Sequence, residues 1–423
     1  MTALVVNAII GAAPFGVPSE LLKLLGSAST LGVVLGGVAT AIVIACFAEV
    51  ASKFTEPGGA YIYARTVFGR FAGVQVGWFS WLTRMSSAAA SATIFISYLG
   101  GLVPSLEFGA GRLVVLTAVL GMLALANYVG VRSGANVSSV VAVAKVAPLL
   151  VIGIYAVMHG SWSSSIPQAR EVAEPGLRNW FEAFLIMSFM YGGCDTAMMP
   201  LGEVKEPRRT VPLGLAGGLL VCIVVFTVVQ MAVVGTAGVE TSTRPLAQVA
   251  WVYFGAAGAV LVSVAAMVST YGHLSANTLS VPRLTYALAE QGDFPRFFAR
   301  MHPRFQTPHV SVIIFALLVW VIAATGTFRF AVALSVGARL ITYLSTCAAV
   351  IPLRRSHPQR KGFEVPFAPA LSIVACVMSL ALITRVHQRE AIALAITMLV
   401  ATASWWFTRN KAQKREPVET SVR

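Results

Sequence analysis

Two stretches of sequence place poor helix formers inside apolar segments that are otherwise suited to helices. The first, "IIGAAPFGVPSE" at 9–20, contains Gly11, Pro14, Gly16 and Pro18. The second, "FMYGGCDTAMMPLGE" at 189–203, has Gly192 and Gly193 in its middle. An unwound segment in hydrocarbon leaves backbone groups unpaired at several kcal/mol each, unless a cavity or a ligand satisfies them.

The two breaks together therefore predict a site in which backbone groups hold a polar substrate. The N-termini of the half-helices carry partial positive charge and would favour an anionic group such as a carboxylate. A kink that serves packing alone is the alternative, because glycine and proline are common in membrane helices.

Three basic residues lie deep in apolar segments and could also take part in chemistry. Lys145, in "VAVAKVAPLL", lies about 14 Å along its helix at 1.5 Å per residue. A buried lysine is costly, which makes it a candidate proton carrier, although its long side chain could instead reach the membrane surface. Arg84 and Arg339 cannot lose their protons, so we expect them to pair with Asp195, with Glu49 or with carbonyls at the helix breaks.

The elements that must position these residues are predicted to be membrane helices. The chain has 57% hydrophobic and 11% charged residues with a mean hydropathy of +0.77, whereas soluble domains carry about 25% charge. We predict an all-α integral membrane protein with about twelve spans, each long enough for a hydrocarbon core of about 30 Å. The expected spans are 2–22, 30–51, 74–103, 113–130, 136–158, 179–201, 211–236, 248–288, 309–325, 328–352, 367–385 and 388–407. The eighth is too long for one crossing, so its last turns are expected to continue into the cytoplasm.

The broken helices begin the first and sixth spans, which predicts two repeats of five spans that mirror each other across the membrane. The first inverted repeat would occupy 1–158 and the second 179–352. Spans 11 and 12 would occupy 367–407, and a basic cytoplasmic tail would occupy 408–423. His273 and Asn277 in the eighth span could face the cavity, or could be satisfied polar residues of the core.

The net charge of +14 has a topological explanation, so nucleic-acid binding is not expected. With both termini inside, about 20 of the 31 Lys and Arg residues fall on the cytoplasmic side. The five cysteines lie in apolar spans without CxxC spacing, and no cofactor or metal site is predicted.

Four motifs resemble those of the amino acid–polyamine–organocation superfamily of permeases. They are "EPGGAYIYARTVFG" at 56–69, "GWFSW" at 77–81, "YGGCDTAMMPLGEVKEPRRTVP" at 191–212 and "PRLTYALAEQGDFPRFFARMHPRFQTP" at 282–308. The resemblance implies a LeuT-type fold, a plasma-membrane location, and uptake or exchange of amino acids or related amines.

The resemblance also implies a site. The family often has Gly-Ser-Gly in the unwound stretch that receives the substrate carboxylate, and here Gly11, Ala12 and Ala13 stand there, followed by Pro14, which has no N–H to donate. Phe189 matches an aromatic lid, and Lys145 matches a lysine found where sodium-coupled relatives hold an ion. The candidate substrate-binding residues are Ile10, Gly11, Ala12, Ala13, Phe189, Gly192, Gly193, Cys194 and Asn277, and the candidate coupling residues are Lys145 and Asp195.

The function predicted from these features is secondary active transport of amino acids or amines by alternating access, coupled to protons or working by exchange. The partners would be a small-molecule substrate, protons and the lipid bilayer, and the oligomeric state stays open. A sodium-coupled symporter and a transporter-like nutrient sensor without flux are the alternatives. A membrane enzyme is disfavoured because no HExxH-type cluster or ATP-binding glycine loop is visible.

Overall fold

The computed structural model describes residues 1–54, 58–130, 137–159, 175–197, 207–236, 238–239, 242–356 and 362–412, and every regular element in these ranges is helical. The α-helices are α1 (Thr2–Ile9), α2 (Ala13–Leu25), α3 (Ser29–Ser52), α4 (Ala60–Phe68), α5 (Arg70–Leu102), α6 (Gly109–Val129), α7 (Val137–His159), α8 (Leu177–Met190), α9 (Cys194–Ala197), α10 (Pro207–Val234), α11 (Pro245–Glu290), α12 (His309–Thr325), α13 (Phe328–Ala348), α14 (Val350–Ser356), α15 (Ala368–Ile383) and α16 (Gln388–Ala412). Short 3₁₀ turns lie at Gly26–Ala28, Pro104–Leu106 and Arg296–Ala299. The basic tail predicted at 408–423 lies outside the described residues from 413 onward.

Seven helical segments within the described residues are long and apolar enough to cross a membrane, so the chain is a multi-pass membrane protein. Lys145–His159, His309–Thr325 and Ala368–Ile383 are shorter apolar helices. The first and sixth predicted spans are each divided by a break. The total of twelve crossings therefore stays a prediction.

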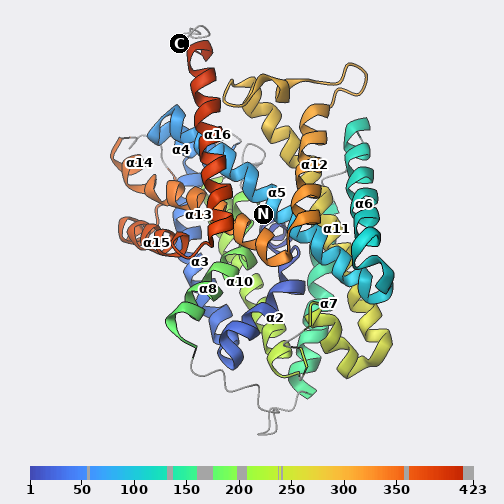
Figure 1. The fold of residues 1–423 in the computed structure, drawn as a ribbon. Coiled ribbons are helices and arrows are strands. Elements are labelled where there is room, and N and C mark those ends of the chain that lie inside the picture. The colour runs from blue at the N-terminus through green and yellow to red at the C-terminus, as the bar shows by residue number, and fades with distance from the viewer. Residues whose placement is uncertain are drawn as a thin grey trace.

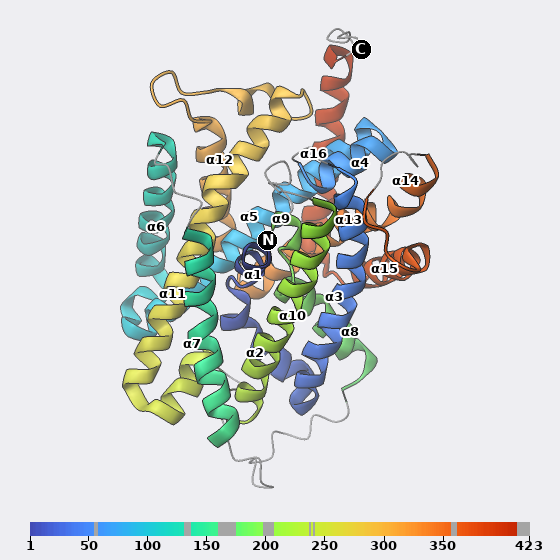
Figure 2. The ribbon, with the colours of Figure 1, turned by 180° about the vertical axis from the view of Figure 1, so that it is seen from behind.

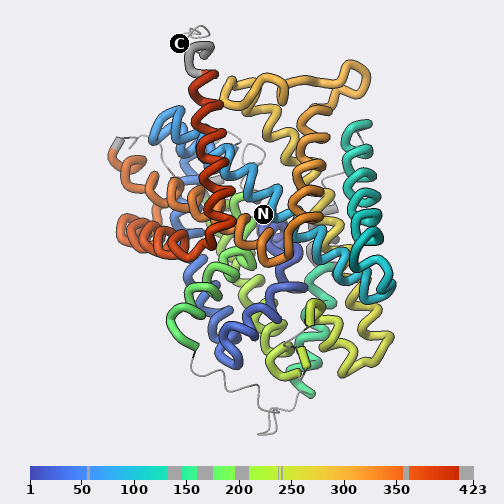
Figure 3. The backbone as a smooth tube through the Cα atoms, in the orientation of Figure 1, coloured from blue at the N-terminus to red at the C-terminus, as the bar shows by residue number. Residues whose placement is uncertain are grey.

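Two helices form the centre of the bundle. In an apolar 18-residue stretch of α5, and in one of the segment that begins with α13, 72% of the residues are buried. Helices α5 and α13 pack against each other. In the corresponding stretches of α6 and α16 only 17% of the residues are buried, because these helices lie at the periphery (Figure 1). Figure 3 shows α16, in red, running to one end of the molecule, whereas the N-terminus lies near mid-height.

The two predicted breaks are present and lie beside each other. Helix α1 stops at Ile9 and α2 starts at Ala13, while α8 stops at Met190 and α9 starts at Cys194. Figure 2 shows α1 and α9 together near mid-height of the bundle, where they are in contact. The unwound residues are thus 10–12 and 191–193, whereas the sequence predicts non-helical residues near 11–14 and near 192–195.

Helix α11 is too long for one crossing, and a kink near its beginning accounts for part of this length. Gly255 has φ 63° and ψ −158° inside this helix, a backbone conformation that glycine adopts readily. The kink turns Pro245–Phe254 away from the rest of the helix, as the bend in α11 shows (Figure 2). The expectation that the last turns of this helix continue into the cytoplasm stays a prediction.

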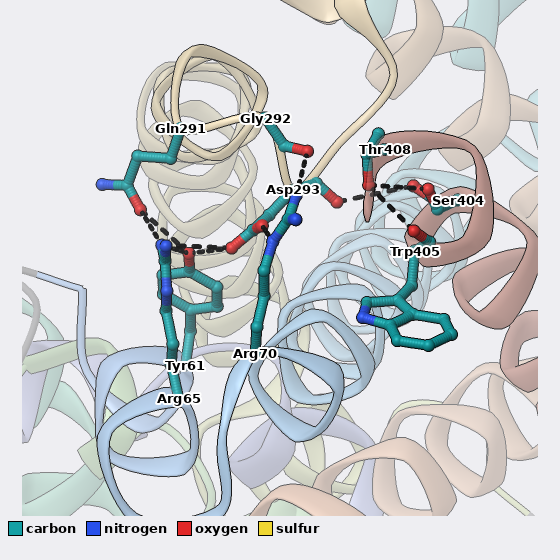
Figure 4. Close-up of polar contacts among 9 residues, drawn as sticks. All are labelled: Tyr61, Arg65, Arg70, Gln291, Gly292, Asp293, Ser404, Trp405 and Thr408. Carbon is teal, nitrogen blue, oxygen red and sulfur yellow. Dashed lines mark hydrogen bonds and ion pairs between the residues drawn. The ribbon is translucent and has the colours of Figure 1, made fainter. Parts of the chain in front are cut away.

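A polar cluster around Asp293 ties α4, α5 and α16 to the end of α11 (Figure 4). Asp293 is fully buried; Arg70 Nε donates to its Oδ1 at 2.7 Å, and Arg65 Nη1 lies 3.2 Å from its Oδ2. Tyr61 donates its hydroxyl to the same carboxylate, and burial together with that negative charge raises the pKa of Tyr61 above its usual range. On the other side, Ser404 Oγ donates to the Asp293 carbonyl at 3.4 Å. The cluster fixes one end of the bundle through a carboxylate that is neutralised by two arginines.

Candidate functional site

A cavity of about 160 Å³ lies between the two helix breaks. Ligand pockets for drug-sized molecules measure about 300–1,000 Å³, so this cavity suits a smaller metabolite. The first break lines it with Gly11, Ala12 and Ala13, and the second with Gly192 and Gly193. Its polar lining within the described residues consists of Asn7, Arg84, Ser87, Lys145, Asp195, His273, Asn277, Ser280 and Arg339. These residues come from α1, α5, α7, α9, α11 and α13, so the site exists only in the folded bundle.

The first break is a tight turn followed by a fresh helix start. Ile10 has φ −79° and ψ 87°, and the Gly11 N–H donates to the Ile9 carbonyl at 3.0 Å, as in an inverse γ-turn. Pro14 falls in the first turn of α2, where a missing N–H costs nothing. The first turn of a helix leaves N–H groups without intrahelical partners, and Gly11, Ala12 and Ala13 line the cavity beside this turn.

The second break depends on glycine for close packing. Gly193 has φ +126°, and a Cβ added there would lie 2.5 Å from the Ala8 carbonyl oxygen of α1. A Cβ at Gly192 would lie 1.3 Å from Arg339 Nη1. The absence of side chains at these positions lets the second break approach both the end of α1 and an arginine of α13.

Lys145 connects α7 to the first break. Its Nζ donates to Asn7 Oδ1 at 2.9 Å and to the Ile10 carbonyl at 3.3 Å. The ammonium lies at the C-terminal end of α1, where the helix dipole favours a cation. The side chain is buried against the cavity, which argues against its reaching the membrane surface.

Two arginines and one carboxylate provide the other charges of the cavity. Arg84 Nη2 lies 3.4 Å from Asp195 Oδ2, the pairing that the sequence suggested. Arg339 Nη1 donates to the Ser188 carbonyl near the end of α8 at 3.4 Å. Glu49 is not their partner, because Arg354 binds it through Nε at 2.6 Å and Nη2 at 2.8 Å.

Helix α11 closes the cavity with polar side chains that are largely engaged. Gly11 packs against the His273 ring, because a Cβ at Gly11 would lie 2.9 Å from its Nδ1. The His273 Nε2 lies 3.2 Å from Ser87 Oγ of α5, and Asn277 Nδ2 donates to the His273 carbonyl at 2.9 Å. Ser269 Oγ donates to the Gly11 carbonyl at 3.3 Å. The unwound backbone of the first break thus receives a partner from this helix.

An aromatic pair lies beside the cavity. Phe189, in the last turn of α8, lines the cavity and meets Phe328 of α13 edge to face, with ring centroids 6.3 Å apart. Phe328 also lines a neighbouring cavity of about 300 Å³. The two rings therefore separate two cavities.

The structure brings most of the predicted site residues together. Gly11, Ala12, Ala13, Lys145, Phe189, Gly192, Gly193, Asp195 and Asn277 all line the cavity. Ile10 and Cys194 do not: both are fully buried, Ile10 contributes only its carbonyl to Lys145, and the Cys194 Sγ lies 3.8 Å from the Tyr343 hydroxyl. Asn7 and Ser87 were missed, although Asn7 is a lone polar residue one turn before the break in an apolar helix.

Comparison with known proteins covers nearly the whole chain. A family model described as "Amino acid permease" matches residues 1–408. The serine/threonine exchanger SteT of Bacillus subtilis (strain 168) is 25% identical over 415 residues, 95% of this chain and 92% of its own. The methylthioribose transporter of the same organism is 27% identical over 399 residues, 89% of this chain and 84% of its own. An uncharacterized transporter of Mycobacterium bovis is 26% identical over 384 residues, 88% of this chain and 82% of its own.

Proposed function

The chain belongs to the amino acid permease family, and from this premise we propose that it is a secondary active transporter that moves amino acids or related amines across the plasma membrane by alternating access. The observation that carries the proposal is the meeting of two interrupted helices at one small polar cavity. Unwound backbone inside a membrane is tolerated where it is buried in protein or lines a cavity. In this proposal the fold is a five-plus-five inverted repeat with two further spans, and both termini are cytoplasmic.

The relatives support a small-molecule substrate and leave its identity open. One relative is named for exchange of serine and threonine, and another for transport of methylthioribose. We propose that the lining residues of the breaks, together with Phe189 and Asn277, contact the substrate. The amides at the start of α2 would receive its carboxylate.

We propose coupling to protons or to exchange rather than to sodium, on the evidence of Lys145. Its ammonium lies 2.9 Å from the Asn7 side-chain oxygen and 3.3 Å from the Ile10 carbonyl oxygen. These are oxygen ligands of the kind that a bound cation would need. A protonated lysine can hold α7 against the end of α1, and loss of its proton would weaken that contact.

The test is uptake by the purified protein in proteoliposomes, with radiolabelled amino acids and amines as substrates. The pH gradient, the sodium gradient and unlabelled substrate inside the vesicles are varied one at a time, with empty liposomes as the control. We expect an inward proton gradient or internal substrate to drive uptake. The uptake rate should not depend on the sodium gradient. Strict dependence on sodium would establish the symporter alternative, and saturable binding without flux would identify a sensor.

A further inference from the structure

The charges that line the central cavity do not balance. Among the described residues, Arg84, Lys145 and Arg339 are basic, and Asp195 is the acidic lining residue. Arg84 faces Asp195, and Lys145 lies against the carbonyl end of α1. Lys145 and Arg339 therefore both lack an acidic counterpart among these lining residues. Lys145 has two oxygen ligands at 2.9 and 3.3 Å, whereas the hydrogen bond described for Arg339 is 3.4 Å long.

Arg339 is poorly satisfied for a buried guanidinium. It is 6% exposed, its Nε has no hydrogen-bond partner among the described residues, and its Nη1 makes a long bond of 3.4 Å to the Ser188 carbonyl. An ion buried without a partner is costly, and a guanidinium fork fits a carboxylate with two parallel bonds. The lack of a side chain at Gly192 places this guanidinium directly against the second helix break.

Asp195 shows the complementary deficiency on the same cavity. Its Oδ2 faces Arg84, but its Oδ1 is buried and accepts no hydrogen bond within the part of the chain that the structure describes. One cavity thus contains an unsatisfied donor on a cation and an unsatisfied acceptor on an anion.

We propose that the substrate is an amino acid with an acidic side chain, and that Arg339 binds the side-chain carboxylate. Asp195 Oδ1 receives the ammonium group, and the amides at the first break receive the α-carboxylate. This assignment rests on the proposed transport function and narrows its substrate class. A neutral amino acid would leave Arg339 without an anion, and an amine without an acid would add positive charge to a cavity that already has an excess of it.

Another role for Arg339 is purely structural, because a cation near the last turn of α8 is favoured by the helix dipole. The two roles differ in what they control. If Arg339 is only structural, replacing it changes the stability of the protein and the affinity for every substrate alike. If Arg339 binds the substrate, replacing it changes the ratio of the affinity for an acid to the affinity for its amide.

The experiment compares binding of aspartate with asparagine, and of glutamate with glutamine, to the purified full-length protein by calorimetry. Each pair differs in charge at nearly constant size. The wild type should bind the acid at least about tenfold more tightly than the amide, the loss expected for one charge-assisted hydrogen bond. Arg339→Gln should reduce this ratio to about one, and Arg339→Lys should retain an intermediate ratio.

Three results would overturn the inference. The first is wild-type protein that binds the amides as tightly as the acids. The second is Arg339→Gln protein that keeps the wild-type ratio. The third applies if Arg339→Gln does not fold: it is Arg339→Lys protein that keeps the full wild-type ratio of acid to amide affinity. In each case uptake of neutral amino acids would leave the transport proposal intact, whereas no uptake of any amino acid or amine would refute transport itself.

Discussion

Three glycine-to-alanine substitutions test whether the geometry at the second break is understood. All add one methyl group at a buried position, but what that methyl meets differs. At Gly192 it would lie 1.3 Å from the end of the Arg339 side chain, at Gly193 it would lie 2.5 Å from the Ala8 backbone oxygen, and at Gly77 of α5 its nearest neighbour is 3.4 Å away. The expected results are therefore different for the same chemical change.

Gly192→Ala should impair the site and spare the fold. The guanidinium must retreat by about 2 Å to reach an ordinary contact of about 3.5 Å, which a flexible side chain can do cheaply. Losing a charge-assisted hydrogen bond to the substrate costs about 1.5–3 kcal/mol, so affinity should fall about 10- to 100-fold. Gly193→Ala should instead destabilise the protein by more than about 2 kcal/mol, because a φ of +126° strains an alanine and backbone cannot yield easily.

The assay measures the melting temperature and the affinity for the best-bound wild-type substrate in each purified variant. Gly77→Ala, which lies outside the central cavity, should match the wild type in both. The reasoning is refuted if Gly192→Ala binds with wild-type affinity, or if Gly193→Ala melts at the same temperature as Gly77→Ala.

Three further substitutions address stability, coupling and recognition. Asp293→Asn should cost about 3–5 kcal/mol because it breaks a buried ion pair, whereas Glu182→Gln, at a carboxylate beside two exposed arginines, should cost less than about 1 kcal/mol; equal shifts in melting temperature would contradict this. Lys145→Ala should abolish the pH dependence of uptake while part of the binding survives, and identical pH profiles for variant and wild type would make this lysine structural. Ala13→Leu should block substrate binding while leaving the protein folded, since Ala13 lines the cavity, and unchanged affinity would remove the start of α2 from the site.

The helix breaks were predictable because glycine and proline act locally. The bounds shifted by one or two residues, since Pro14 and Cys194 belong to helices rather than to the unwound stretches. A proline in the first helical turn needs no hydrogen-bond partner for its nitrogen, so it marks the start of α2. The sequence pattern alone could not distinguish a proline that breaks a helix from one that starts a helix.

The partners of the deep charges were less predictable, because they depend on which helices lie side by side. Arg84 and Asp195 meet as one of the suggested pairs. Glu49 was offered as an equal candidate, yet it binds Arg354, which is 305 positions away in sequence. Arg339 bonds the Ser188 carbonyl near the second break, which agrees with the expected pairing with carbonyls at the breaks. Its close approach to Gly192 was not predicted, because it arises from the packing of α13 beside this break.

The surroundings of the central cavity indicate what must move if it is to open alternately to the two sides. On one side the Phe189–Phe328 pair separates it from a larger cavity of about 300 Å³ that Arg112 and Glu107 also line. On the other side Arg84 and Asp195 line both the central cavity and a space of only about 10 Å³ beside Tyr61, and the Asp293 cluster lies beyond it. The first route needs rotation of two aromatic rings, whereas a second route through the Asp293 cluster would separate a fully buried carboxylate from two arginines, which is costly. We therefore expect access from the Phe328 side to require the smaller rearrangement, and access from the Tyr61 side to need compensation from substrate binding or from the state of Lys145. Since a ligand can shift an equilibrium only by its differential affinity for the two states, the charges that line the cavity are the groups placed to supply that difference.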